Sequence, residues 1–316
     1  MKDTFGRNIN YLRISVTDHC NIRCRYCIPE GTSFKVHYND VLRIEEICEL
    51  AKVFIELGIK KIRITGGEPL MRRGLETFIE EISAIDKLEE LTITTNGILL
   101  KEKAKFLKDH KINRINISLQ TLKPDRYEWI TRGGKLNDVL AGIEEAKKIG
   151  FFPIKLNVVL VKNFNEDEIE NFVELTKNEP VEVRFIELMP VGESNSNLEF
   201  VSNKIVLNRF PDLLPIVEGD LQSPSTCYKM EGYAGQIGLI SPLSHNFCAN
   251  CNRLRLTADG RLKLCLHSND EISLRDALRK GKNVAEIISE AVMLKPQNHK
   301  LEKGEHLKKC MIQVGG

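Results

Sequence analysis

Short apolar runs alternate with longer amphipathic stretches over roughly the first 190 residues of the chain. The short runs are rich in β-branched residues and alternate like strands, whereas the longer ones repeat their apolar residues every three or four positions, like helices. The pattern predicts six strands, at residues 11–16, 61–65, 91–95, 114–119, 154–160 and 181–186. Helices are expected between them, at residues 44–57, 74–84, 101–108, 136–149 and 167–176.

Strict alternation of strand and helix indicates a parallel sheet with right-handed crossovers. Six units are too few to close an eight-stranded barrel. We therefore expect an α/β fold, a partial (β/α)6 TIM-like barrel that is open on one side. A doubly wound open sheet is the alternative that the pattern leaves open.

The rhythm changes after about residue 195. Short strands are expected at residues 236–240, 253–257 and 261–264, with Asp259-Gly260 as a hairpin turn between the last two. Two helices are expected at 274–280 and 284–294, and the basic residues from 295 to 309 are expected to be a solvated tail. We expect residues 1–195 to form the barrel domain and residues 196–316 to form an extension that caps its open side.

Composition limits the possible functions only broadly. The chain has 316 residues, 42% hydrophobic and 28% charged, with a net charge of +2, as is usual for a globular protein without affinity for nucleic acid. No stretch approaches 18 apolar residues and the first residues lack an apolar leader, so we expect no membrane span and a cytoplasmic location. Nine cysteines, an odd number, do not suggest a disulfide framework in that compartment.

Three cysteines follow the first predicted strand with the spacing C-x3-C-x2-C: Cys20, Cys24 and Cys27. In a parallel barrel this loop lies at the face where active sites gather. Three neighbouring thiolates require a cation. Zinc completed by His19 or His37 is one possibility, and a 4Fe–4S cluster with one open iron position is the other.

Three more cysteines, Cys248, Cys251 and Cys265, have the spacing C-x2-C-x13-C. A zinc site that includes His267 remains possible, and the alternative is a second cluster whose open iron faces the substrate. Arg253 and Arg255 alternate along the strand that follows Cys251 and therefore share one face. Their planar guanidinium groups suit a phosphate-bearing substrate. The remaining cysteines, which lack ligand spacing, are expected not to bind metal: Cys48, Cys227 and Cys310.

The first triad, with Tyr26 before its last cysteine, resembles the signature of the radical S-adenosylmethionine superfamily. Gly66-Gly67-Glu68-Pro69 after the second strand resembles that superfamily's GGE-type motif. The resemblance implies that the open iron chelates S-adenosylmethionine and that one electron cleaves it to a 5′-deoxyadenosyl radical. Several stretches resemble, more narrowly, the GTP 3′,8-cyclases of molybdenum cofactor biosynthesis: residues 11–18, 63–69, 94–97, 184–189, 247–255 and 315–316.

This narrower resemblance implies two 4Fe–4S clusters, one on each cysteine triad. It also implies which residues bind the cofactor and the substrate. It implies contacts to S-adenosylmethionine from Tyr26, Gly67, Ser118 and Met189. It implies contacts to GTP from Arg13, Arg63, Thr94, Lys155, Arg253 and Arg255. It also implies that Gly315 and Gly316 reach into the site and are needed for activity.

By the same resemblance, GTP would become (8S)-3′,8-cyclo-7,8-dihydroguanosine 5′-triphosphate. The expected partners are a reducing electron donor and a downstream pyranopterin-forming enzyme, with the chain a monomer or homodimer. Gln120 departs from the pattern, since these relatives usually carry aspartate there. Two other hypotheses are a peptide-modifying radical enzyme with an auxiliary cluster and an electron carrier that never cleaves S-adenosylmethionine.

Overall fold

The structure is a computed structural model that describes residues 1–31, 40–192, 198–216, 222–299, 301 and 307–316. His37, a candidate zinc ligand, lies outside these residues. Within them the strands form one twelve-stranded sheet in the order β12-β11-β10-β1-β2-β3-β4-β5-β6-β9-β8-β7. The middle of this order follows the chain, and the two ends come from the extension.

The six central strands are parallel and neighbour one another in chain order, which confirms the partial barrel. The order does not reverse as it would in a doubly wound sheet, so that alternative was wrong. The strands are β1 (Tyr11–Ser15), β2 (Lys61–Thr65), β3 (Glu90–Thr95), β4 (Arg114–Ser118), β5 (Ile154–Leu160) and β6 (Val181–Glu187).

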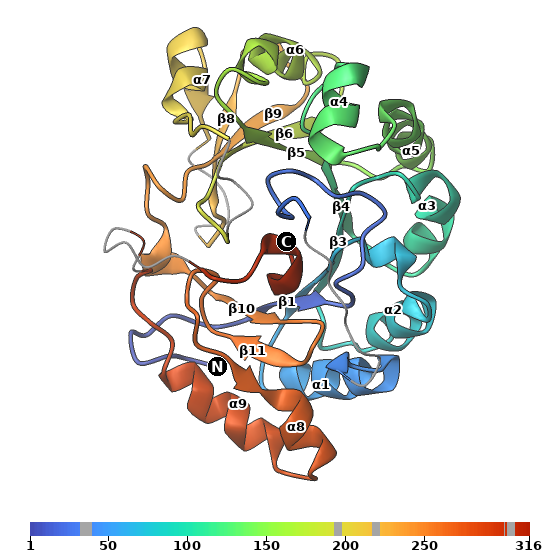
Figure 1. The fold of residues 1–316 in the computed structure, drawn as a ribbon, viewed down its shortest axis with the longest axis vertical. Helices are drawn as coiled ribbons and strands as arrows, with labels where there is room; N and C mark the ends of the chain where they lie inside the picture. The colour runs from blue at the N-terminus through green and yellow to red at the C-terminus, as the bar shows by residue number, and fades with distance from the viewer. Residues whose placement is uncertain (32–39, 193–197, 217–221, 300, 302–306) are drawn as a thin grey trace.

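Helices cover the outer face of this curved sheet (Figure 1). They are α1 (Ile44–Glu56), α2 (Leu75–Ser83), α3 (Leu100–Asp109), α4 (Pro124–Thr131), α5 (Leu136–Lys148) and α6 (Ile169–Glu174). Helix α1 shows why they pack there, because its stripe of Ile47, Leu50, Ala51 and Phe54 is buried. Each large apolar side chain removed from water contributes about 1.5–3 kcal/mol. Short 3-10 helices, η2 (Pro69–Met71) and η3 (Glu166–Glu168), lie in the loops.

The extension adds strands to both edges of the barrel sheet. Strand β9 (Gln236–Ile240) pairs in parallel with β6, and β10 (Arg253–Leu256) pairs in parallel with β1. Strand β11 (Arg261–Lys263) is antiparallel to β10, as the Asp259-Gly260 turn predicted. The sheet is thus continuous across residue 195, and the division into domains at that residue stays a prediction.

The extension also contains short helices and strands outside these pairings. They are α7 (Lys204–Arg209), β7 (Leu214–Pro215), β8 (Ser225–Lys229), η4 (Cys248–Asn250), β12 (Ile272–Ser273), α8 (Leu274–Arg279) and α9 (Val284–Met293). No helix in the described part of the chain is long and apolar enough to cross a bilayer.

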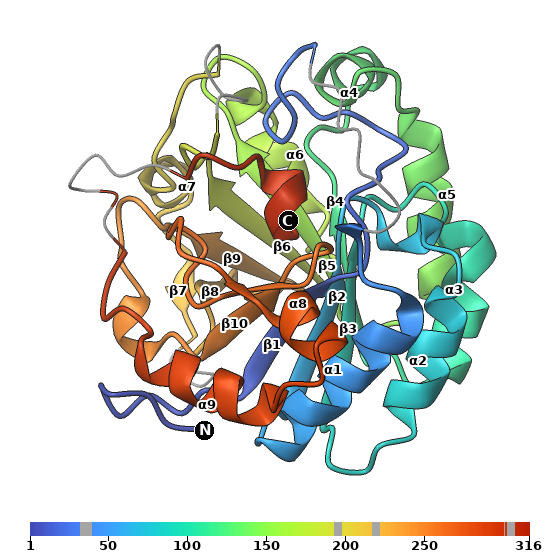
Figure 2. The same ribbon diagram turned by 60° about the horizontal axis from the view of Figure 1, so that its bottom comes forward.

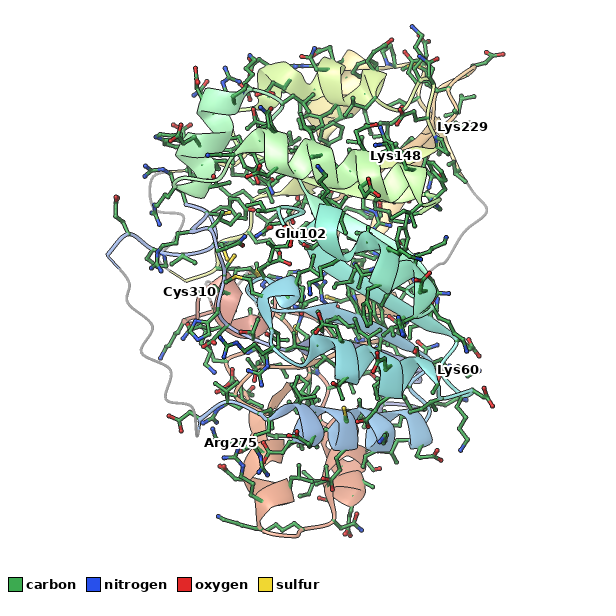
Figure 3. The ribbon with its side chains drawn as sticks, turned by 90° about the vertical axis from the view of Figure 1, so that its right-hand side faces the viewer. Lys60, Glu102, Lys148, Lys229, Arg275 and Cys310 are labelled. Carbon is green, nitrogen blue, oxygen red and sulfur yellow. The ribbon has the colours of Figure 1, made fainter. Side chains whose placement is uncertain are left out.

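The last described segment turns back into the molecule. The 3-10 helix η6 (Met311–Val314) and the C-terminus lie at the centre of the curved sheet in both ribbon views (Figures 1 and 2). Figure 3 shows Cys310, just before η6, on the opposite side of the molecule from Lys60. Lys60 precedes β2, so the tail occupies the carboxyl ends of the strands.

Candidate active site

One cavity of about 320 Å³ contains most of the residues that the sequence singled out. It is lined by both cysteine triads and by Gly316. Its lining also includes the predicted contacts Arg13, Tyr26, Arg63, Gly67, Thr94, Ser118, Met189, Arg253 and Arg255. Two groups far apart in the sequence, around residues 20–27 and 248–265, are therefore brought to a single chamber.

The first triad is held by the Gly66-Gly67-Glu68-Pro69 loop. The amide of Gly67 donates to the carbonyl of Thr17 at 2.7 Å, and the amide of Glu68 donates to the carbonyl of His19 at 2.7 Å. A Cβ atom on Gly67 would lie 2.2 Å from the carbonyl oxygen of His19. Only glycine permits this close approach, so the loop that follows β2 fixes the loop that carries the cysteines.

Glu68 links this loop to the end of β3. Its buried carboxylate accepts hydrogen bonds from Leu70 N at 3.0 Å, Thr95 Oγ1 at 2.8 Å and Asn96 N at 2.7 Å. Burial raises the pKa of Glu68 to about 7. The Asn96 side chain in turn donates to Cys20 Sγ at 3.8 Å. The motif had drawn attention to Glu68, but its role as a brace was not predicted.

The thiols of the first triad are poorly ionised by the protein alone. Burial raises the pKa of Cys20 to about 11 and that of Cys24 to about 12, and it raises the pKa of Cys27 as well. A bound metal centre must therefore displace their protons. In the described ranges no three His, Cys, Asp or Glu side chains come close enough to hold a single metal ion. Three thiols in one loop beside the cavity suit a 4Fe–4S cluster with one open iron position.

Tyr26 is tied to Gln120, the residue that departs from the family pattern. Gln120 Nε2 donates to Tyr26 Oη at 2.9 Å, and Gln120 Oε1 accepts from Val159 N at 2.7 Å. Gln120 is buried and also lines the cavity. Its amide therefore orients a side chain that is expected to contact S-adenosylmethionine.

A row of arginines crosses three neighbouring strands. Arg13 on β1 is the register partner of Arg255 on β10 and of Arg63 on β2. Burial, together with the neighbouring arginine charges, lowers the pKa of Arg13 to about 9, of Arg63 to about 9 and of Arg255 to about 10. Closely packed cations of this kind favour a polyanionic ligand. Thr94 Oγ1, also at the cavity, is buried without a hydrogen-bond partner.

Lys155 differs from the other predicted GTP contacts. It is buried and forms an ion pair with Glu182, and it does not line the cavity. Burial and the charge of Arg184 lower the pKa of Lys155 to about 8. Arg184 lines the cavity instead. The sequence contained a signal for Arg184, because it lies in the stretch 184–189 that carried the resemblance.

The second triad lies at the other side of the cavity, beside positive charge. Burial would raise the pKa of Cys251, but the Arg253 and Lys295 cations lower it to about 7. Burial raises the pKa of Cys248. His267 and His299 also line the cavity, and their ring centroids are 5.3 Å apart. Part of this triad is therefore prepared to act as thiolate before any metal binds.

The tail enters the arginine row. Arg13 Nη2 donates to Gly316 O at 2.7 Å, and Arg255 Nη1 donates to the same oxygen at 3.1 Å. Gly315 has a φ of +81°, and a Cβ atom there would lie 2.9 Å from Ser15 Cβ. The structure thus brings Gly315 and Gly316 to the site. Whether they are needed for activity stays a prediction.

Comparison with known proteins agrees with this geometry. Residues 14–176 match the model of the radical SAM superfamily, and residues 181–301 match that of Molybdenum Cofactor Synthesis C. Streptococcus suis SuiB, a solved structure, is 13% identical with a TM-score of 0.60, covering 86% of this chain and 65% of that one, and this likeness concerns the fold alone. The chain belongs to the radical S-adenosylmethionine enzymes.

Closer relatives define the branch of the superfamily. A GTP 3′,8-cyclase of Peptoclostridium acidaminophilum is 51% identical over 99% of this chain and 98% of its own length. Another, from Alkaliphilus oremlandii, is 48% identical over the full length of both chains. Within the superfamily, this chain is a member of the GTP 3′,8-cyclase family. Its cofactors are accordingly S-adenosylmethionine and two 4Fe–4S clusters, which the two cysteine triads fit.

Proposed function

We propose that this chain cyclises GTP to (8S)-3′,8-cyclo-7,8-dihydroguanosine 5′-triphosphate, the first step of molybdenum cofactor biosynthesis. The supporting observation is that two cysteine triads and an arginine row line one cavity. An electron carrier needs no such chamber. A peptide-modifying enzyme has less use for three adjacent arginines, two of them buried, than an enzyme that binds a triphosphate does.

Each triad has its own role in this proposal. Cys20, Cys24 and Cys27 would hold the cluster that binds S-adenosylmethionine, and reductive cleavage of this cofactor supplies the radical. Tyr26, Gly67, Ser118 and Met189 would position the cofactor. Cys248, Cys251 and Cys265 would hold the second cluster, with an open iron position for the guanine.

The arginine row would bind the triphosphate. Arg13, Arg63 and Arg255 share one register, and Arg253 lies two residues before Arg255 on the same face of β10. A charge-assisted hydrogen bond contributes about 1.5–3 kcal/mol. Thr94 has a free acceptor and donor at the cavity, which suits a ribose or phosphate oxygen. Lys155 would assist through Glu182, with which both Lys155 and the cavity residue Arg184 form ion pairs.

The bond changes define what the site must align. The ribose 3′ C–H bond breaks and the hydrogen atom leaves with the adenosyl group. A bond then forms between C3′ and C8 of guanine. The 7,8-dihydro product requires one more electron and one proton at N7. Holding C3′ and C8 near contact distance is therefore the main task of the protein.

The partners follow from this chemistry. The electrons require an external reducing donor, and the product requires a downstream pyranopterin-forming enzyme. We place the chain in the cytoplasm, as a monomer or homodimer, acting on GTP rather than on nucleic acid.

An anaerobic assay tests the proposal. The reconstituted protein would be reduced with dithionite and supplied with S-adenosylmethionine, with and without GTP. We expect 5′-deoxyadenosine and the cyclic product to form together when GTP is present. Deoxyadenosine without a GTP product would point to another substrate, such as a peptide. Formation of neither compound by protein carrying both clusters would favour an electron carrier.

A further inference from the structure

Lys295, directly after α9, is buried beside the second cysteine triad. Lys295 is only 2% exposed. Its ammonium group donates to Arg253 O at 2.9 Å and to Leu264 O. Arg253 lies two residues after Cys251, and Leu264 immediately precedes Cys265. One lysine thus joins the two chain segments that carry these cysteines, and the expectation of a solvated tail beginning at residue 295 was wrong.

The positive charge of Lys295 has no carboxylate partner among the described residues. Its neighbour Lys263, also fully buried, lies 3.4 Å from a carboxylate oxygen of Glu271, and buried Arg7 lies 2.6 Å from one of Asp3. A buried charge without a counter-charge is strongly disfavoured. Burial lowers the pKa of Lys295, and the groups that oppose this effect and favour its charged form are Cys251 and Cys265.

The triad has a further brace from the N-terminal segment. Arg7 Nη1 donates to Cys248 O at 2.9 Å and to Gln297 O at 3.0 Å, while Arg7 Nη2 donates to Pro296 O at 2.7 Å. Residues 295–297 are therefore attached to the chain at, or within two residues of, all three cysteines. Arg7 acts through a neutral backbone and has its own acid, whereas Arg253 and Lys295 act directly on Cys251. Of these two cations, Lys295 is the one whose ammonium group joins both chain segments of the triad.

A 4Fe–4S cluster held by three thiolates is an anion in both of its usual oxidation states, and it becomes more negative on reduction. We propose that Lys295 is the positioning residue of the second cluster: its fixed charge balances the cluster anion, and its two hydrogen bonds hold the ends of β10 and β11 at the spacing the cluster needs. The inference rests on the second triad binding a cluster and not on the identity of the substrate.

The test uses the full chain with Cys20, Cys24 and Cys27 replaced by alanine, so that only the second cluster is present. Iron content and the midpoint potential would be measured by dithionite titration, without S-adenosylmethionine or GTP. In this background Lys295→Gln keeps a hydrogen-bond donor and removes the charge, whereas Lys295→Arg keeps the charge. Lys263→Gln is the matched control, because Lys263 is a buried lysine of β11 with its own carboxylate.

We expect the parent and Lys295→Arg to hold about four irons per chain. Lys295→Gln should either retain the cluster at a more negative potential, because reduction adds charge that is no longer balanced, or lose it while Lys295→Arg keeps it. Lys263→Gln should leave the potential unchanged.

An unchanged potential in iron-replete Lys295→Gln would overturn the proposal. So would loss of iron from both Lys295 variants, because the charge alone would then not secure the cluster. An equal shift of the midpoint potential in Lys263→Gln would also overturn it, because any buried lysine near the triad would then have the same effect. None of these readouts depends on turnover, so a failure of the GTP assay would leave the result interpretable.

Discussion

Arg13 and Arg255 lie opposite each other on adjacent parallel strands, and both donate to the carbonyl oxygen of Gly316. One strand comes from the barrel and the other from the extension. The arginine row, which we propose binds the triphosphate, is therefore created where the two parts of the sheet join, and the tail rests on it. Substitutions at this junction should affect GTP binding without affecting the cysteines.

Replacing Arg13 with alanine should weaken GTP binding. Loss of one charge-assisted contact of about 1.5–3 kcal/mol corresponds to a rise in Kd of roughly tenfold to a hundredfold. Iron content should not change. Anaerobic calorimetry with GTP, in the absence of S-adenosylmethionine, measures the effect. Arg73→Ala, at an exposed arginine, serves as the control, and an equal loss there would contradict the assignment.

Replacing Gly67 with alanine should prevent the first cluster from assembling. The new methyl group would overlap the carbonyl of His19, and backbone must move to relieve the contact. We expect iron to fall from about eight to about four per chain, with loss of deoxyadenosine formation. Gly232→Ala is the control: its φ of +78° makes alanine strained there too, but nothing lies within 4 Å of the added Cβ and it is not a cavity-lining residue, so its iron content should not fall. Normal iron content in Gly67→Ala would refute this account of the loop.

Substitutions in the two cysteine triads should have different effects on cofactor cleavage and on product formation. Cys24→Ala should abolish cleavage of S-adenosylmethionine, whereas Cys265→Ala should retain some cleavage and lose the cyclic product. Chromatography of deoxyadenosine and product distinguishes them. Cys48, buried on α1 away from both triads, gives the control Cys48→Ala, which should keep both activities. Full product formation by Cys265→Ala would exclude a substrate-binding role for the second cluster.

Cluster assembly should depend on pH differently at the two triads. The raised pKa values of Cys20 and Cys24, about 11 and about 12, mean that protons compete with iron throughout the neutral range. Affinity at the first triad should therefore rise steadily with pH. Cys251 has a pKa of about 7 and is therefore mostly ionised above neutral pH, so it adds little to the pH dependence of iron binding there. Iron loading against pH, in chains with one triad replaced by alanine, tests this. Parallel curves would contradict it.

Gln120→Leu should weaken binding of S-adenosylmethionine. The change removes the hydrogen bonds to Tyr26 and Val159 and leaves Val159 N, a half-buried donor, without a partner, which costs about 1 kcal/mol. Gln120→Asp, by contrast, can still accept from both groups and should bind the cofactor nearly normally. Equilibrium binding measures both variants. If Gln120→Leu bound as tightly as the parent, Tyr26 would not need this support.

The elements of the barrel were predictable because local pattern determined them. Strands such as β5 and β6 are β-branched and bounded by turns, and α1 has a continuous apolar stripe. Helix α4 was not predicted, since only Tyr127, Ile130 and Thr131 of its residues are buried. The pairing of β10 with β1 is a tertiary relationship that no local pattern encodes.

The types of residue at the site were predictable from the sequence, but which of them face the cavity was not. Lys155 and Asn157 share one face of β5, yet only Asn157 reaches the cavity, where its register partner is Arg184. Position along a strand decides which basic residue faces the ligand, and alternation alone does not give it. Lys295 was misassigned for a similar reason, because a basic run gives no sign that one member is buried.

The pairing of β1 with β10 has a consequence for how the protein folds. Residues 11 and 253 must meet before the arginine row exists, whereas β1 to β6 join neighbours in chain order. Closing so long a loop carries a large entropic cost and slows the step that requires it. The barrel should therefore fold first, and the arginine row should form last. A newly made chain would acquire the half that carries the first cysteine triad before the half that carries the second.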